Sequence, residues 1–380
     1  MNFGKRFSIA MLCISASLTI GCDKPHSRAP NARGGESNDD SKVVNLYIWA
    51  DYLAPDTIAS FEKQTGVNVR IAYFDSPETL ESRMLTGSSG FDVVVPTSVF
   101  VQRQIRSGAY LSIDKSKLPN LINLDPAIMA QVALNDPGNA HGVAYMWGTA
   151  GIGYDEKMLA QALPNGPRDS SRLFFDPAVA SKLAKCGINI MDDPVGVVRI
   201  VLRYLGRNPN APSPQDFADV EAVLSKIRPY IRNIDTTGDI EAMANGDVCL
   251  ALAYNGDVVQ ARKRAKEAKN GITIEFAIPK EGTFVWIDML AIPKDAPHIA
   301  NAYLLINYLM NPPVIAGISK YIGFANANSA ATPLLDASIA SDTAIYPTPD
   351  LRRRLFVPLE PSPEQTRVIT RIWQKFKTGQ

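Results

Sequence analysis

The stretch that decides the fold is "VVNLYIWADYLAPDTIASFEKQTGVNVRIAYFD", residues 43–75. Its first seven residues are rich in β-branched and aromatic side chains, which predicts a strand over 43–49. The spacing of apolar side chains predicts a helix over 54–66, capped by Asp56 or a neighbouring residue. A second alternating strand is predicted over 67–75. Strand and helix therefore alternate with short connections, which is typical of a mostly parallel α/β sheet.

The same alternation continues through the chain. Strands are predicted over 91–97, 187–192 and 248–256, and helices over 76–87, 99–108, 195–206 and 257–271, with two more helices between 298 and 322 separated at Pro312–Pro313. We predict that 272–279 and 284–293 are paired strands. The glycine-rich segment 148–155 lacks a dinucleotide-binding register and is predicted to be a turn. So many alternating units indicate two α/β lobes.

Composition narrows the class of protein. The chain has 380 residues, of which 46% are hydrophobic and 20% are charged, enough material for two globular domains. Its formal net charge of +1 argues against nucleic acid, because binding there depends on concentrated basic charge. We therefore expect a globular protein that does not bind nucleic acid.

The N-terminus is typical of an exported protein. Residues 1–22 have Lys5 and Arg6, a short apolar run and then Cys22 after small residues, which is typical of a lipoprotein signal peptide. Plain secretory cleavage without lipidation is the alternative. Residues 23–42 contain no large apolar side chain and are predicted to be a flexible tether, spanning roughly 25 Å as a random coil.

The cysteines divide by position. Cys13 would leave with the signal peptide, and Cys22 is the predicted lipid anchor. Cys186 and Cys249 remain in the predicted mature chain. They form either a disulfide or two buried thiols, and export favours the disulfide because oxidised pairs persist outside the cytoplasm.

Aromatic residues and aspartates recur where predicted strands end, which is where α/β proteins bind ligands. Five clusters are of this kind: Trp49–Asp51, Pro96–Ser98, Met191–Asp193, Tyr254–Asp257 and Trp286–Asp288. Carboxylates hold a protonated amine by charge-assisted hydrogen bonds, and aromatic faces add cation–π attraction. The alternatives are that the rings fill the core and that Asp51 or Asp257 only caps a helix. Asp288 lies inside a predicted strand between apolar neighbours, where a buried carboxylate needs a partner.

Signatures of catalysis are absent from the sequence. It has three histidines, His26, His141 and His298, and no HExxH, GxSxG or Walker motif. Asp192 and Asp193 alone do not make a metal site. We therefore expect no catalytic residue, no metal and no cofactor.

Several longer motifs together resemble one family. They are "YIWADYLAPDT" (47–57), "GFDVVVPTSVF" (90–100), "YMWGTAGIGY" (145–154), "NGDVCLALAYNGD" (245–257), "AKEAKNG" (265–271) and "FANANSAATP" (324–333). From about Val43 to the C-terminus the chain resembles the periplasmic putrescine/spermidine-binding proteins of ABC importers.

The resemblance implies a two-lobed periplasmic binding protein fold (type II), with crossover strands between the lobes and a ligand cleft that closes on a hinge. Lobe 1 would comprise residues 44–148 and about 275–318, and lobe 2 residues 149–274 and about 319–380. The resemblance also implies that Cys186 and Cys249 pair.

The family's ligand-binding positions fall on nine residues of this chain: Trp49, Asp51, Tyr52, Thr97, Tyr254, Asp257, Trp286, Asp288 and Phe324. The family's serine between Trp49 and Asp51 is Ala50 here, and Thr97 replaces another serine but keeps a hydroxyl. The acidic residue of putrescine binders falls on Gly196. One carboxylate is therefore missing, unless Asp193 or a water replaces it. The ligand could then be putrescine-like, a longer polyamine, a monoamine or an ω-amino acid.

The sequence thus predicts a periplasmic solute-binding lipoprotein, tethered to the inner membrane by Cys22. It would capture a small cationic amine and deliver it to an ABC permease. A ligand-sensing subunit of a membrane signalling receptor is the alternative function, and an enzyme acting on amines is disfavoured.

Overall fold

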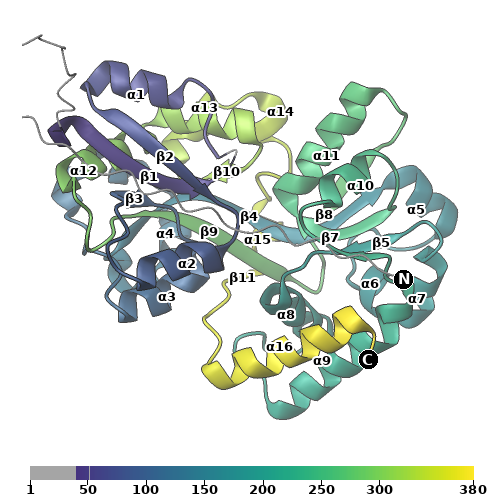
Figure 1. Cartoon of the computed structure of the whole chain (residues 1–380). Helices are drawn as coiled ribbons and strands as arrows, with labels where there is room; N and C mark the ends of the chain where they lie inside the picture. The colour runs from purple at the N-terminus through teal and green to yellow at the C-terminus, as the bar shows by residue number, and fades with distance from the viewer. Residues whose placement is uncertain (1–39, 51) are drawn as a thin grey trace, which may run out of the picture. The chain divides into compact units, whose positions relative to one another are not determined.

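Two groups of strands, each covered by helices, form the part of the chain that this computed structural model describes, residues 40–50 and 52–380 (Figure 1). The strands are β1 (Val43–Trp49), β2 (Asn68–Phe74), β3 (Val93–Val94), β4 (Gly142–Asp155), β5 (Ile188–Ile190), β6 (Asn233–Ile234), β7 (Leu250–Tyr254), β8 (Ile274–Ala277), β9 (Thr283–Ala291), β10 (Ala325–Asn326) and β11 (Leu355–Phe356).

The α-helices are α1 (Thr57–Thr65), α2 (Pro77–Leu85), α3 (Ser98–Arg106), α4 (Pro126–Val132), α5 (Glu156–Ala162), α6 (Arg172–Phe175), α7 (Pro177–Leu183), α8 (Pro194–Tyr204), α9 (Pro214–Ile227), α10 (Asp239–Ala244), α11 (Asn255–Ala268), α12 (Ile299–Leu309), α13 (Pro312–Ile322), α14 (Ala337–Ala340), α15 (Pro349–Arg352) and α16 (Pro363–Thr378). The predicted alternation of strands and helices is confirmed. Short 3₁₀ turns connect several of these elements, including Asp40–Lys42 at the end of the predicted tether.

The strand order runs β2-β1-β3-β9-β4-β7-β5-β6. β1 is parallel to β2 and β3, and β5 is parallel to β6 and β7. The long strands β4 and β9 are antiparallel to each other and connect the two parallel groups. The sheet is therefore mixed, with parallel strands on both sides of an antiparallel centre.

The glycine-rich segment 148–155 is the end of strand β4, so the predicted turn is wrong. β4 pairs with β9 as far as Thr149 and with β7 from Ala150 on, and every one of its residues is buried. A Cβ atom at Gly148 would overlap the ring of Trp286, and one at Gly151 would overlap the ring of Phe276. These glycines leave room for aromatic rings and do not turn the chain.

The predicted pairing of segments 272–279 and 284–293 is also wrong. Both contain a strand, but β8 pairs with the second half of β4 while β9 pairs mainly with its first half. The two strands are thus neighbours of one long strand and not of each other.

The side chains of β1 alternate between two layers, as expected for a strand with helices on both faces. Leu46 and Ile48 belong to a large first core, to which α12 and α13 contribute. Tyr47 packs on the opposite face with Phe74 and with Leu80 of α2.

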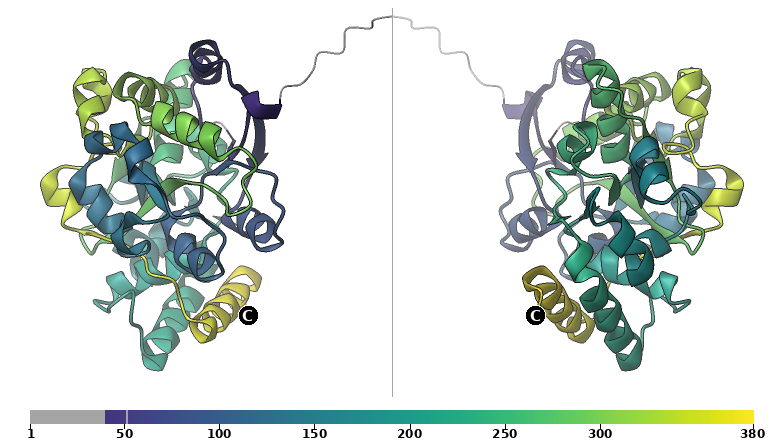
Figure 2. Two further views of the ribbon diagram at one scale, coloured as in Figure 1. Left: turned by 90° about the vertical axis from the view of Figure 1, so that its left-hand side faces the viewer. Right: turned by 90° about the vertical axis from the view of Figure 1, so that its right-hand side faces the viewer.

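A second core is built around β5, β7 and the second half of β4. It includes Ile152, Ile190 and Leu252, and α8, α9 and α16 pack together to cover it (Figure 2). Trp286 of β9 packs against both cores.

One segment packs differently from the sequence-based division into lobes. Ala325 and Ala327 lie in the first core, because β10 pairs with β4 at Trp147 and Met146, whereas the prediction assigns residues from about 319 to lobe 2. α16 belongs to the second core, as that division has it. The lobe boundaries as a whole stay a prediction.

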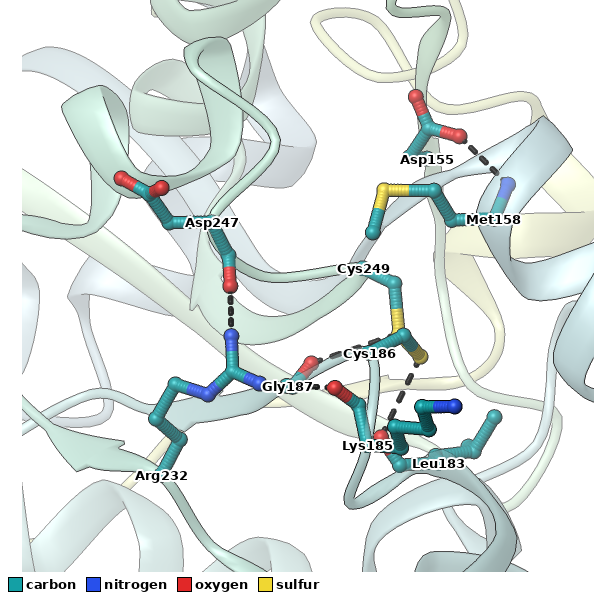
Figure 3. Close-up of a disulfide and its surroundings, with 9 residues drawn as sticks. All are labelled: Asp155, Met158, Leu183, Lys185, Cys186, Gly187, Arg232, Asp247 and Cys249. Atoms are coloured by element: carbon teal, nitrogen blue, oxygen red, sulfur yellow. Dashed lines mark hydrogen bonds between the residues drawn. A yellow bond between two sulfur atoms is a disulfide. The ribbon is translucent and has the colours of Figure 1, made fainter.

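A disulfide joins Cys186 and Cys249, with 5.4 Å between their Cα atoms. It ties the starts of the adjacent parallel strands β5 and β7. Arg232 also connects the segments before these two strands, because its guanidinium donates hydrogen bonds to the carbonyl oxygens of Lys185 and Asp247 (Figure 3). The pairing that the family resemblance implies is confirmed.

Residues 1–39, which include the predicted signal peptide, Cys22 and most of the tether, lie outside the described residues, and so does Asp51. Within the described residues, no helix has the length and hydrophobicity needed to cross a membrane.

Candidate functional site

Asp288, in the middle of β9, is a buried carboxylate with only 5% of its surface exposed. It accepts hydrogen bonds from the hydroxyl groups of Tyr52, at 2.7 Å, and Thr97, at 2.6 Å. Burial raises the pKa of Asp288 to about 7, although both hydrogen bonds act to lower it. The partners that a buried carboxylate requires are therefore present, and both of them are uncharged.

The backbone places these partners. Met289 donates to the carbonyl of Pro96 at 2.9 Å, and Thr97 lies opposite Asp288 in an antiparallel bridge, so the segment after β3 runs directly beside β9. Tyr52 is buried, and its backbone carbonyl accepts a hydrogen bond from the hydroxyl of Tyr145 at 3.1 Å. Burial and the charge of Asp288 raise the pKa of Tyr52 well above its usual value, so its hydroxyl stays protonated as a donor.

Four aromatic rings form a continuous row of edge-to-face contacts. Centroid distances are 5.9 Å between Tyr52 and Phe324, 5.2 Å between Phe324 and Trp286, and 6.4 Å between Trp286 and Tyr254. The row begins at the tyrosine that binds Asp288 and ends at Tyr254, whose hydroxyl donates to Asp193 at 3.0 Å.

Glycines make room for this row. A Cβ atom at Gly256, in the first turn of α11, would overlap the ring of Phe324, just as one at Gly148 would overlap Trp286. Asn255 fixes the same turn, because its amide oxygen accepts from the backbone N–H of Thr149 and its amide nitrogen donates to the carbonyl of Ala344.

Asp193 caps α8 by accepting from the backbone N–H of Gly196 at 2.8 Å. Burial raises its pKa, and hydrogen bonds from Gly196 and Tyr254 and the charge of Arg199 offset part of that rise. A Cβ atom at Gly196 would overlap the Asp193 carboxylate and the ring of Phe284. Asp193 thus fills the space that a side chain at Gly196 would need.

Asp257 is the acidic residue in the first turn of α11, whose N-cap position is Tyr254. Burial raises its pKa to about 7. Burial is the largest cause that raises the pKa of Tyr254, and the charges of Asp193, Asp257 and Asp288 add to it; of these three, Asp193 accepts a hydrogen bond from the Tyr254 hydroxyl.

Asp239, at the start of α10, is a buried acidic residue that the sequence analysis missed. Its side chain is 1% exposed, and burial, followed by the charge of Asp257, raises its pKa to about 8. It follows no aromatic residue, which was the pattern used to select candidates. Asp239 follows Gly238, as Asp257 follows Gly256, and this shared Gly–Asp pair is the signal that could have found it.

Hydrogen bonds, ring contacts and charge interactions link seven of the nine predicted ligand residues: Tyr52, Thr97, Tyr254, Asp257, Trp286, Asp288 and Phe324. Trp49 makes different contacts. Its indole N–H donates to the carbonyl of Val95 at 3.1 Å, and its ring packs on Phe74. The assignment of these residues to a ligand stays a prediction.

The described residues contain no group of three or more histidine, cysteine or acidic side chains arranged to hold a metal ion. The arrangement is instead one of aromatic rings and carboxylates, of which only Asp193 feels the charge of a basic residue, Arg199, among the described residues. No ion pair of the described residues includes Asp193, Asp239, Asp257 or Asp288.

The fold is that of the two-lobed α/β solute-binding proteins. The chain superposes on a spermidine/putrescine ABC transporter substrate-binding protein from Streptococcus pneumoniae with a TM-score of 0.76 at 24% identity, over 89% of this chain and 99% of that one. With a lipoprotein of Treponema pallidum the TM-score is 0.73 at 26% identity, over 88% and 99%.

The sequence narrows this class to a family. A model of the bacterial extracellular solute-binding proteins matches residues 56–348, and the chain belongs to this family. It is 45% identical to the putrescine-binding periplasmic protein PotF of Escherichia coli, over 90% of this chain and 92% of that protein. It is 42% identical to the putrescine-binding periplasmic protein SpuD of Pseudomonas aeruginosa, over 90% and 93%.

Proposed function

We propose that this protein is an extracytoplasmic solute-binding protein that captures a polyamine and delivers it to an ABC permease of the inner membrane. The observation that carries the proposal is the buried carboxylate of Asp288 together with the partly buried carboxylate of Asp257, which lack a positively charged partner in the described residues and lie beside a row of aromatic rings. A buried carboxylate that is not neutralised is costly, and an ammonium group would remove that cost.

The chemistry of the row fits an aliphatic polyamine. Methylene groups pack on aromatic faces, and each face adds about 0.5–2 kcal/mol of cation–π attraction to a nearby ammonium. In this proposal Trp286 and Phe324 hold the hydrocarbon part, and Asp257 and Asp288 accept hydrogen bonds from the charged ends. Trp49 and Asp51 complete the predicted site from the end of β1.

The role in transport follows from the family and from the names of the relatives, which bind putrescine in the periplasm. We propose the same compartment, with the protein held at the inner membrane through lipidated Cys22. The Treponema pallidum relative is itself a lipoprotein, which supports the anchor. The proposed protein binds and releases its ligand unchanged and is not an enzyme.

A thermal-shift panel tests this function. The ligands are putrescine, cadaverine, spermidine, agmatine, 4-aminobutyrate and common amino acids, each at a concentration well above the expected dissociation constant. A ligand at a hundred times its dissociation constant stabilises the folded state by about 2.7 kcal/mol, so a true ligand raises the melting temperature clearly. A panel in which no amine shifts the melting temperature would refute the proposal.

A further inference from the structure

Asp239 is buried, but the described residues do not use the hydrogen-bonding capacity of its carboxylate. Neither of its carboxylate oxygens has a hydrogen-bond partner in the described part of the chain. Burial and then the charge of Asp257 raise its pKa, and the charge of Asp235 adds a little; the nearby backbone N–H groups of Ile240 and Asp239 offset only part of this rise, because neither is aligned well enough to form a hydrogen bond with the carboxylate. A carboxylate so placed gains from any cation that reaches it.

Other buried aspartates of this chain are satisfied internally. Asp92 accepts hydrogen bonds from the backbone of Asn45 and from His298. Asp155 caps α5 and also accepts from the backbone N–H of Thr273. Asp239 differs from these structural carboxylates because its oxygens are left without donors.

The second acidic group, Asp257, lies on the adjacent helix. α10 and α11 pack against each other (Figure 1), and Asp257 follows directly on Gly256, the residue whose backbone contacts the ring of Phe324. Asp257 therefore adjoins the aromatic row, and the packing of α10 on α11 brings the helix of Asp239 to the same region. The remaining charged residue of α10, Glu241, forms an exposed ion pair with Arg264.

We propose that Asp239 and Asp257 together bind one ammonium group of the amine ligand. The inference rests on the proposed amine-binding function and adds a ligand residue to it. Asp239 thereby supplies the second carboxylate that the chain lacks at Gly196, where Asp193 fills the space that a side chain would need.

The pair also defines the class of ligand. With two carboxylates at one end and Asp288 available for the other, both ends of the ligand meet negative charge. A diamine or longer polyamine fits this arrangement, whereas the carboxylate of an ω-amino acid would be repelled. We expect putrescine to bind at least tenfold more tightly than 4-aminobutyrate.

Isothermal titration calorimetry of the full chain with putrescine tests the inference. Asp239→Asn removes the charge but keeps the shape, and it should weaken binding by about ten- to a hundredfold, the usual effect of losing one charged hydrogen bond. Glu241→Gln is the matched control, because it removes the same charge from the exposed side of the same helix and should leave the affinity unchanged. If Asp239→Asn does not fold, Asp239→Ser serves for the same comparison.

The possible results of this titration distinguish the proposed amine-binding function from the proposed role of Asp239. If the wild-type protein binds no amine, the proposed function falls and this inference falls with it. If the wild type binds putrescine and Asp239→Asn binds equally well, only the inference is overturned. Failure of both Asp239 variants to fold would show that the carboxylate holds the fold, which would also contradict it. The inference is supported if Asp239→Asn folds and binds putrescine more weakly while Glu241→Gln binds it as the wild type does.

Discussion

At the scale of single residues, Asp288 shows why we propose a cationic ligand. Tyr52 and Thr97 donate hydrogen bonds to both carboxylate oxygens, which fixes their position. Hydroxyl groups carry no charge, so the carboxylate keeps its desolvation cost, and its pKa is raised to about 7 for that reason. The residue is therefore held in place for a positive ligand but not neutralised by the protein.

Substitution of Asp288 by asparagine should weaken polyamine binding at least about a hundredfold, because one ammonium loses its charged partner. The melting temperature of the ligand-free protein should change little or rise, since an unneutralised buried charge is removed. Calorimetric affinity and thermal unfolding, measured together, check this. Asp350→Asn, at an exposed residue paired only with Arg353, is the control. Unfolding of the Asp288 variant would show a purely structural role.

Binding should depend on pH. The pKa is raised to about 7 for Asp257 and Asp288 and to about 8 for Asp239, from about 3.9 in the unfolded chain. Stability that comes from a raised pKa is fully present below about pH 4 and is lost as the pH rises through the folded-state value. The ligand-free protein should therefore become less stable between about pH 5 and pH 8.5.

The affinity for an amine ligand should rise with pH over the same pH range in which the stability of the ligand-free protein falls. Between pH 6 and pH 8 the carboxyls of Asp257 and Asp288 lose most of their protons, which favours an ammonium ligand by up to roughly tenfold per group, and Asp239 ionises toward the upper end of this range. Calorimetry at several pH values measures this trend, and release of protons on binding at pH 7 would accompany it. An affinity that is constant from pH 6 to pH 8 would contradict the assignment of these carboxylates to the ligand.

The sequence predicts residues of this site well where local pattern and environment agree. Asp288 was expected to need a partner because it lies between apolar neighbours in a strand, and it has two. Asp239 was missed because it follows no aromatic residue and because α10 and α11 come together only through tertiary packing. Asp56 precedes α1, but its side chain makes no capping hydrogen bond.

At the scale of elements, two glycines let backbone and aromatic rings approach closely. Gly148 lies in β4 against Trp286, and Gly256 lies in α11 against Phe324. The aromatic row therefore depends on the absence of two side chains as much as on the presence of four rings.

The variant Gly256→Ala should displace the ring of Phe324 and weaken polyamine binding by about tenfold or more, because the new methyl group has no free space. Gly317→Ala is the matched control: this residue is inside α13 and has nothing within 4 Å of the added Cβ. Alanine is favoured over glycine within a helix by about 1 kcal/mol, so the control should be slightly stabilised and bind normally. Equal affinities of the two variants would show that the Phe324 contact is not needed.

Replacement of both Cys186 and Cys249 by serine should lower stability by about 4 kcal/mol in the chain-entropy model and leave binding nearly unchanged. The disulfide lies at the starts of β5 and β7, whereas Asp193 and Tyr254 lie at or beyond their ends. Denaturant unfolding and calorimetry of the double variant check the two halves of this prediction. A large loss of affinity at unchanged stability would contradict it.

Helix boundaries were predictable from the sequence where a capping residue or a proline marks them locally. Ser76 caps α2 and Pro77 begins it, as the sequence indicates, and α12 and α13 separate at Pro312. The glycines of β4 were misread as a turn because their role is set by rings from other strands. The neighbours of β8 and β9 were misassigned because both pair with β4, far away in the sequence.

At the scale of the whole molecule, β4 and β9 are shared by two hydrophobic cores, and Trp286 packs against both. The number of lobes was predictable from the amount of strand–helix alternation. The assignment of Ala325 and Ala327 was not, because the pairing of β10 with β4 is a long-range contact. We expect small-angle scattering to show a smaller radius of gyration when the ligand-bound lobes close, and an unchanged radius would contradict hinge closure.

The most direct test is a calorimetric titration of the purified protein with putrescine and spermidine at pH 8, where Asp257 and Asp288 are largely ionised and Asp239 is about half ionised. The account predicts saturable binding of at least one of them with one ligand per chain, and much weaker binding of 4-aminobutyrate under the same conditions. Absence of binding by every polyamine, or tighter binding of 4-aminobutyrate than of putrescine, would contradict it.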